Sequence, residues 1–237
     1  MEKYPIFNER LYLRSPSINV CFRLVIEGAY DKNTVEEALV KAHTRHPFLG
    51  CSVNIDNDNN TWLVKNNKPI HLDCYKSNEM DWQAWYQKND NIPFDFLNEN
   101  LVKFCVIVGE NTEIIILGHH ILGDGIGYLN LANDILLALD SRIELKPQIP
   151  PTETNFKKTK KLNFIEKMYA KSINKKWKTS KKQFSENEYI SFFEQYRDKY
   201  RPNLFMGSIE NENLKKLLEN SKSNGLSVNE RLKNNVV

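Results

Sequence analysis

HHILGDG, residues 119–125, is the stretch of sequence on which the fold prediction depends. It follows the apolar run 113–118 and precedes the apolar-periodic segment 126–139, so we expect a buried strand to give way to a helix here. Ligands of α/β folds gather at such junctions, because strand ends and helix N-termini converge there. A histidine side chain can titrate near neutral pH, and a nearby carboxylate can fix its surroundings. Successive side chains of an extended chain point to opposite faces, so only one of the two histidines can face a given cavity.

A structural histidine, satisfied inside the fold, is the alternative to a catalytic one at this junction. The spacing argues against a zinc site, because the two histidines are adjacent instead of four residues apart on a helix, and neither a Cys-x-x-Cys pair nor a third ligand lies nearby. A serine hydrolase is also disfavoured, since the chain has no Gly-x-Ser-x-Gly motif.

Composition places the chain among ordinary soluble globular proteins. At 237 residues it can form one large or two small domains, and its hydrophobic and charged contents are 41% and 27%. The formal net charge of +3 is too small to indicate nucleic-acid binding. The N-terminus has no secretory signal and no apolar run is long enough to span a membrane, so the sequence predicts a cytoplasmic protein. The four cysteines have apolar, strand-like surroundings and are predicted to be buried, reduced thiols: Cys21, Cys51, Cys74 and Cys105.

Periodicity and turn residues predict most elements of the first 140 residues. Residues 4–17 have little periodicity and are expected to be irregular. Alternating or continuous apolar runs predict strands at 19–28, 51–56, 61–65, 70–74, 101–109 and 112–118. Apolar residues at helical spacing predict helices at 31–43, 81–88 and 125–140, and we interpret Trp82 and Trp85 of the second as core residues.

The remainder of the chain changes in character, and we predict three parts: 1–140, 141–185 and 186–237. Residues 141–154 contain three prolines and indicate an exposed linker. Residues 156–184 are dense in lysine and fit a helix with a basic face opposite an apolar one. This segment is either solvated and partly disordered, or a docking face for an anionic membrane or an acidic carrier protein. Further on, we expect a strand at 204–209 and a helix at 210–221.

The pattern His-His-x-x-x-Asp-Gly resembles the signature of the chloramphenicol acetyltransferase-like superfamily. That group includes condensation domains of peptide synthetases, alcohol acetyltransferases and plant BAHD acyltransferases. Other segments resemble the same superfamily: the helix end at 38–49, which closes with RHPFL; IPFDFL at 92–97; and GLSVN at 225–229. These matches occur in the family's order and extend over most of the chain.

The resemblance implies an α/β (α+β) fold, namely one chloramphenicol acetyltransferase-like half with a mixed, mainly antiparallel sheet packed with helices. It also implies acyl transfer from a thioester, on acyl-CoA or an acyl carrier protein, to a hydroxyl or amine. His120 would be the general base and His119 would support the loop. Asp124 would be structural, pairing with a cation, and Gly125 would allow a tight turn into the helix. The activity requires neither a metal nor a bound cofactor.

The sequence departs from the family pattern after residue 229. In condensation domains and alcohol acetyltransferases, an apolar helix and a second, similar half follow this stretch. Here polar residues, among them Arg231 and Lys233, take that place. We therefore expect an N-terminal half with a truncated tail. Two hypotheses result: an acyltransferase, or an inactive half-domain that at most binds a partner. Because small chloramphenicol acetyltransferases build their site between subunits, a homo-oligomer would be one way to complete the site.

Overall fold

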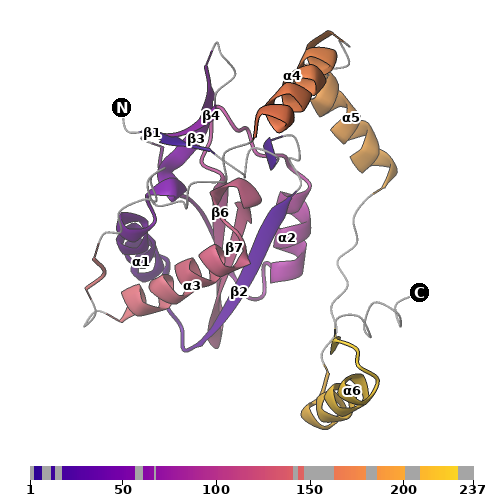
Figure 1. Cartoon of the computed structure of the whole chain (residues 1–237). Helices are drawn as coiled ribbons and strands as arrows, with labels where there is room; N and C mark the ends of the chain where they lie inside the picture. Colours follow the sequence, from indigo (N-terminus) through magenta and orange to yellow (C-terminus); the bar gives the residue numbers. More distant parts are fainter. Residues whose placement is uncertain are drawn as a thin grey trace. The chain divides into compact units, whose positions relative to one another are not determined.

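A four-stranded sheet with the strand order β2-β7-β6-β5 forms the centre of the fold (Figure 1). Its strands are β2 Asn19–Glu27, β5 His71–Lys76, β6 Val102–Val108 and β7 Asn111–His119. β7 pairs antiparallel with both β2 and β6, and β5 runs parallel to β6. The sheet is therefore mixed and mainly antiparallel, which confirms the predicted fold class.

The computed structural model describes residues 3–6, 12–13, 18–56, 61–66, 68–140, 144–146, 163–179, 186–200 and 209–228. The chain divides into two compact units, Met1–Arg201 and Pro202–Val237. The first unit contains both sheets and all but one of the described helices.

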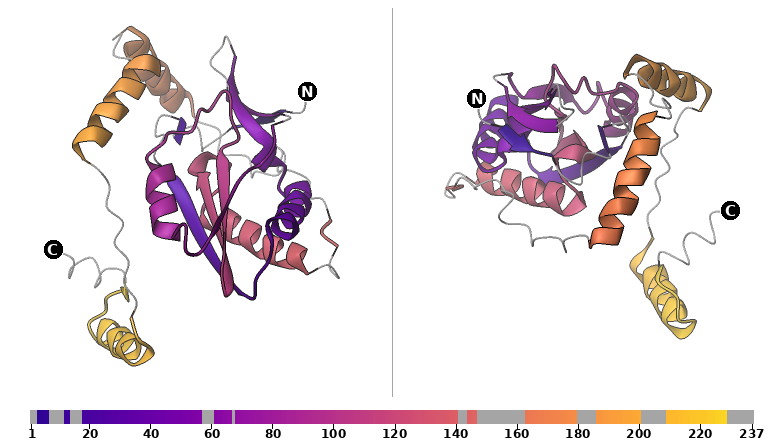
Figure 2. Two further views of the ribbon diagram at one scale, coloured as in Figure 1. Left: turned by 180° about the vertical axis from the view of Figure 1, so that it is seen from behind. Right: turned by 45° about the horizontal axis from the view of Figure 1, so that its top comes forward.

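Helices cover both faces of the central sheet (Figure 2). They are α1 Lys32–Arg45, α2 Trp82–Asp90 and α3 Gly125–Leu139. Side chains of β6 and β7 alternate between the two faces, because neighbouring residues of a strand point in opposite directions. One set packs with α1 and α3, namely Val102, Phe104, Val106, Ile114 and Ile116. The other set packs with Trp85 of α2, namely Cys105, Ile107, Ile115 and Leu117.

Aspartate side chains cap the N-termini of all three of these helices. Asp31 accepts a hydrogen bond from the backbone N–H of Thr34 at 2.8 Å, and Asp81 accepts from two backbone N–H groups of the first turn of α2. At the other end of α1, Pro47 stops the helix and the chain continues in a short 3₁₀ turn, η2, Pro47–Gly50. The helix ranges predicted at 31–43, 81–88 and 125–140 are thus confirmed to within two residues.

A second, smaller sheet has the order β1-β4-β3. Its strands are β1 Lys3–Pro5, β3 Cys51–Ile55 and β4 Thr61–Lys65. The strands predicted at 51–56 and 61–65 are confirmed as β3 and β4, which pair antiparallel, but the prediction of an irregular N-terminus was wrong for β1. This strand is short and lies at the sheet edge, where Pro5 is tolerated because an edge strand has backbone groups that need no partner.

The cysteines all lie on strands, but they are not all buried. Cys51 and Cys105 are buried and Cys21 is partly buried, whereas Cys74 is exposed. The prediction was wrong for Cys74 because β5 is the edge strand of the central sheet. Burial raises the pKa of the Cys21 thiol to about 12, with the nearby Asp90 carboxylate adding to the effect.

Three helices follow the sheets: α4 Phe164–Thr179 and α5 Glu186–Lys199 in the first unit, and α6 Asn211–Ser223 in the second. α4 confirms the helix predicted in the lysine-dense segment, and α6 confirms the one predicted at 210–221. The strand predicted at 204–209 and most of the linker at 141–154 lie outside the described residues. None of the helices in the described ranges has the length and apolar character needed to cross a bilayer.

Candidate functional site

The predicted junction lies where β7 ends at His119 and a short 3₁₀ turn, η3 His120–Leu122, begins. Two backbone hydrogen bonds hold it in place. The N–H of His119 donates to the carbonyl oxygen of Leu101 at 2.9 Å, and the N–H of His120 donates to that of Ile18 at 2.9 Å. The histidine pair is thus fixed to the segments that precede β6 and β2, the two strands that flank β7.

The His119 side chain is completely buried and has structural contacts on several sides. Its Nδ1 accepts a hydrogen bond from the backbone N–H of Ile121 at 3.2 Å, which caps η3. The rings of Phe94 and Phe96 meet the imidazole edge to face, with centroid distances of 6.2 and 4.8 Å. Nδ1 is thus an acceptor in this position, and the ring is enclosed by the two phenylalanines and the turn that follows.

The His120 side chain is partly exposed and has a different environment. Its ring stacks on Tyr12, with centroids 4.4 Å apart and an angle of 25° between the planes. Its Nδ1 is buried, yet no hydrogen-bond partner for it exists among the described residues. Buried polar atoms are rarely left in this state. Of the two neighbouring histidines, only His120 therefore has a buried ring nitrogen that the described part of the fold leaves unpaired.

Asp124 is the N-cap of α3. Its Oδ1 accepts a hydrogen bond from the backbone N–H of Gly127 at 2.9 Å, and the carboxylate lies at the positive end of the helix dipole. We predicted that Asp124 pairs with a cation, but within the described residues it forms this cap and no ion pair.

Gly125 is the first residue of α3, and its backbone does not require glycine. Among the described residues, the glycines with a φ in the left-handed region, between +20° and +160°, are Gly28 and Gly225. A Cβ placed on Gly125 would meet no atom within 4 Å. The predicted role of this glycine, to let the backbone turn tightly into the helix, stays a prediction, and neither its φ nor a close neighbour among the described residues requires glycine here.

Gly118 and Tyr128 form a close contact that the sequence analysis missed. A Cβ on Gly118 would overlap the ring and hydroxyl of Tyr128, which is buried in α3. The Tyr128 hydroxyl donates a hydrogen bond to the carbonyl oxygen of His119 at 2.8 Å, so it supports the junction directly. Burial strongly raises the pKa of this hydroxyl, which therefore stays protonated. A glycine inside a strand pattern was the available signal, since it indicates the close approach of another group.

Asp134 connects the segment around Arg45 to α3. Its Oδ2 is 2.8 Å from Nε of Arg45 and 2.7 Å from Nε2 of His46, and the aspartate is buried. The sequence identified the Arg-His-Pro segment through its resemblance to the superfamily. It gave no indication of the partner, because Asp134 is 88 residues further along the chain than His46.

Lys103 and Tyr12 also lie beside the histidines without having been predicted. Lys103 is buried on β6, and its Nζ is 4.9 Å from the ring centroid of Phe94, which in turn contacts His119. Tyr12 belongs to a short described segment of the N-terminus that periodicity could not place.

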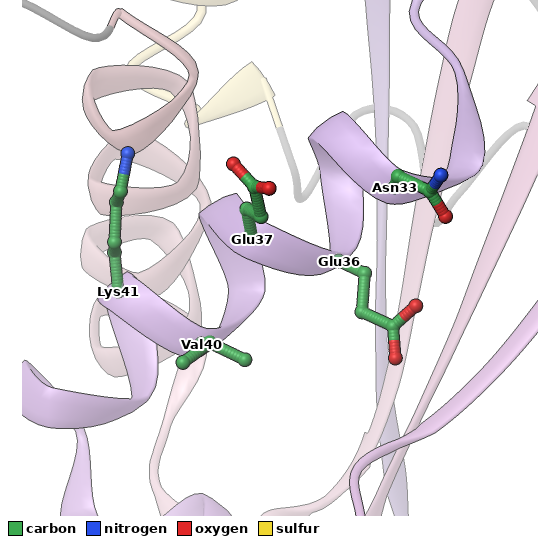
Figure 3. A pocket seen from close by; sticks show the side chains of 5 residues that line it. All are labelled: Asn33, Glu36, Glu37, Val40 and Lys41. Carbon is green, nitrogen blue, oxygen red and sulfur yellow. The ribbon is translucent and has the colours of Figure 1, made fainter.

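A surface hollow of about 500 Å³ lies elsewhere, along the exposed side of α1 (Figure 3). It is lined by Asn33, Glu36, Glu37, Val40 and Lys41. None of residues 119–125 lines it, so it is separate from the candidate site. Across the part of the chain that the structure describes, no three His, Cys, Asp or Glu side chains gather in a metal-binding arrangement.

Neither a protein-family model nor a curated protein matches the chain. Solved structures of condensation domains, however, are similar to it. The starter condensation domain of rhizomide synthetase RzmA has a TM-score of 0.54 and 16% sequence identity, over 60% of this chain and 38% of that one. Tallysomycin biosynthesis protein TlmII has a TM-score of 0.52 and 15% identity, over 60% and 39%. A structure on condensation domain-mediated chain release from the enacyloxin polyketide synthase has a TM-score of 0.50 and 14% identity, over 62% and 32%.

These matches show the fold. The chain shares the mixed α/β architecture of condensation domains, as the HHILGDG stretch led us to expect, but at low sequence identity. The matched region spans less than two fifths of the length of each of these three structures. One variant of the RzmA domain, with a TM-score of 0.52, was solved in complex with C8-CoA.

Proposed function

We propose that this chain is an acyltransferase of the condensation type that moves an acyl group from a thioester to a hydroxyl or amine, with His120 as general base. The difference between the two histidines carries this proposal. The fold engages the His119 ring on several sides, whereas it leaves a ring nitrogen of His120 without a partner among the described residues. A general base needs an imidazole that is held in position and still able to take a proton.

In the proposed reaction, the unprotonated ring nitrogen of His120 takes the proton of the acceptor hydroxyl or amine. The acceptor oxygen or nitrogen attacks the thioester carbonyl, and its electron pair forms the new bond to carbon. The tetrahedral intermediate then collapses, the carbon–sulfur bond breaks, and the thiolate receives the proton from the imidazolium. The products are an ester or amide and a free thiol, and His120 returns to its neutral form.

The other residues of the junction would orient the base. His119 fixes η3 through the hydrogen bond from Ile121, and Tyr128 holds the carbonyl of His119. Stacking on Tyr12 restricts the orientation of the His120 ring. Asp124 would act indirectly, by capping the helix that follows the turn. These are positioning roles, because none of the four side chains is required to exchange a proton with the substrate.

The proposed donor is the thioester of acyl-CoA or of an acyl carrier protein. The support for this is the fold that the chain shares with the RzmA domain, a variant of which binds C8-CoA. Proton transfer and thioester attack need no metal, so the reaction is written with this chain's side chains and the two substrates alone.

One observation favours a second candidate, an inactive half-domain that at most binds a partner. The match extends over 38% of the RzmA domain, so most of that domain's length has no counterpart in the matched region. On this alternative, the junction keeps the fold of the superfamily but does not accelerate the reaction.

Thiol release distinguishes the two candidates. The purified chain is incubated with acetyl-CoA or octanoyl-CoA and a panel of alcohols and amines, and free thiol is measured over time. His120→Ala is compared with wild type, and His71→Ala is the matched control because it removes an exposed histidine from the edge strand β5. We expect His120→Ala to lower the rate by about 10²–10⁴-fold, the usual contribution of a general base.

The control should retain the wild-type rate. Acceleration by wild type that His120→Ala abolishes and His71→Ala leaves intact would support the acyltransferase. Equal background rates for all three proteins with every donor and acceptor would exclude it in favour of the inactive half-domain.

A further inference from the structure

The charges of the chain are unevenly distributed along the sequence. Residues 156–184 contain 11 of the 33 lysines and arginines but only 1 of the 30 acidic residues. This segment therefore carries a formal charge of +10, and the remainder of the chain carries −7. The small net charge of +3 conceals this separation. A block of cations of this size attracts anionic surfaces at low ionic strength.

Helix α4, the described helix of this segment, exposes a cluster of large apolar side chains. We call this cluster the apolar arc. Its members are separated by one, three or four residues, a spacing that places them on one side of a helix. Their exposed fractions are 76% for Phe164, 76% for Ile165, 60% for Met168, 70% for Tyr169 and 47% for Ile173. Five large apolar side chains on one helix, each about half exposed or more, leave a surface that water solvates poorly.

Two lysines of the same helix lie along one edge of the apolar arc. Lys167 and Lys171 are exposed and four residues apart, so they form a row along the axis. At about 100° per residue, Lys167 lies roughly 200° around the axis from Ile165. Lys167 and Lys171 are three and seven residues from Phe164, so the basic row borders the apolar arc along its Phe164 edge.

The amphipathic character of α4 is encoded locally. Asn163 and Glu166 form a capping box: the N–H of Asn163 donates to Oε2 of Glu166 at 2.7 Å, and the N–H of Glu166 donates to Oδ1 of Asn163 at 2.8 Å. The start of the helix, and with it the phase of its two faces, is therefore set by residues of the helix itself.

We propose that α4 binds the surface of an anionic membrane and lies in the plane of the lipid headgroups. The apolar arc would enter the boundary between headgroups and acyl chains, with Phe164 and Tyr169 as aromatic anchors, while the lysine row contacts anionic headgroups. At 16 residues with interspersed lysines, the helix is too short and too polar to cross the bilayer. This inference is independent of the acyltransferase proposal.

An anionic membrane can contact both the apolar arc and the lysine row of α4, whereas a soluble polyanion can contact only the lysines. A nucleic acid would engage the lysines but leave the apolar arc in water. An acidic protein could neutralise the lysine row, yet nothing in its charge would account for five exposed apolar side chains. The two faces together favour a lipid surface, which is both anionic and apolar at the required depth.

Vesicle sedimentation with the full chain tests the proposal. Vesicles of phosphatidylcholine with about 30% phosphatidylserine are compared with vesicles of phosphatidylcholine alone, at low and high salt. We expect co-sedimentation with the anionic vesicles that weakens as salt screens the lysines. Protein that stays in the supernatant with anionic vesicles at low salt would overturn the proposal.

Two double variants test the two faces separately. Lys167→Gln with Lys171→Gln removes two charges from the basic row, and we expect the partition coefficient to fall at least about tenfold. The matched control is Lys32→Gln with Lys41→Gln on α1, which removes the same charge from another exposed helix and should leave binding nearly unchanged. An equal loss from both double variants would show attraction by net charge alone and overturn a role for α4.

Ile165→Gln with Tyr169→Gln keeps the charge and helix-forming tendency of α4 but shortens the apolar arc. We expect it to reduce vesicle binding at least as strongly as removal of the two lysines. Full vesicle binding by this variant would show that the apolar arc is not needed and would overturn the proposal. Tight binding of wild type to an oligonucleotide or to polyglutamate, unchanged by substitutions in the apolar arc, would assign α4 to a general polyanion contact instead of a membrane.

Discussion

The junction between β7 and α3 and the helix α4 illustrate two different ways in which a sequence determines structure. At the junction, Gly118, His119 and Tyr128 are fixed by contacts between residues from separate elements. In α4, the helix is set by its own capping box, and large apolar side chains remain exposed. We infer that stability is concentrated at the junction and its supports, whereas α4 contributes to interactions outside the fold.

The largest difference between the two regions is expected from Gly118→Ala. The new methyl group would overlap the buried Tyr128 ring, so we expect the free energy of unfolding to fall by about 3 kcal/mol or more. Chemical denaturation measures this loss. Gly125→Ala is the matched control, because its Cβ meets no atom within 4 Å, and it should change stability by about 0.5 kcal/mol at most. Equal stability of the two variants would refute the close packing at Gly118.

A smaller loss is expected from Asp134→Asn, which removes the charge that Arg45 and His46 share. Because the aspartate is buried and its two partners are partly exposed, we expect a loss of about 2 kcal/mol in the free energy of unfolding. Glu113→Gln breaks the more exposed pair with Arg23 and should cost less than about 1 kcal/mol. If the two substitutions cost the same, Asp134 has no special role in joining α1 to α3.

Lowering the pH should destabilise the region around α1 through His43. Burial, and secondarily the charge of Lys65, lowers the pKa of His43 in the folded state below its ordinary value of 6.5. The unfolded chain therefore binds the proton more tightly than the folded chain does. The contribution of neutral His43 to the free energy of unfolding is complete above about pH 6.5 and is lost progressively as the pH falls below that value. The free energy of unfolding should drop more between pH 7.5 and 5.5 in wild type than in His43→Gln. An identical drop in both proteins would contradict this assignment.

The smallest effect is expected in α4. Ile165→Gln should change the free energy of unfolding by less than about 0.5 kcal/mol, because the side chain is already in contact with solvent. A loss above about 2 kcal/mol in the same denaturation experiment would show that the apolar arc packs against the rest of the fold, and the contrast between the two regions would fail.

The strands and helices were largely predictable from the sequence, since local patterns dictate them. Continuous apolar runs marked β6 and β7, and Asp31 and Asp81 marked helix starts. The edge strand β1 was missed, because three residues carry too little periodicity to indicate a strand.

The candidate site was predictable only in part. The sequence located the histidine pair and assigned different roles to its members, but it could not identify Tyr12, Tyr128 or Asp134 as neighbours. Those contacts depend on how distant elements pack, as in the pairing of Asp134 with His46 across 88 residues. The sequence also could not distinguish two structural roles of Asp124, because a carboxylate at this position can form a cap or an ion pair, and among the described residues it forms the cap.

The central claim is that His119 supports the junction while His120 remains available for chemistry. It is tested most directly by making the same substitution, glutamine, at each of the two positions and measuring both thermal unfolding and thiol release from acyl-CoA. We predict that His119→Gln lowers the unfolding temperature by several degrees, roughly the effect of losing 1–2 kcal/mol in a protein of this size. His120→Gln should unfold like wild type but lose about 10²-fold or more in rate. A His120→Gln protein that releases thiol at the wild-type rate would contradict the account.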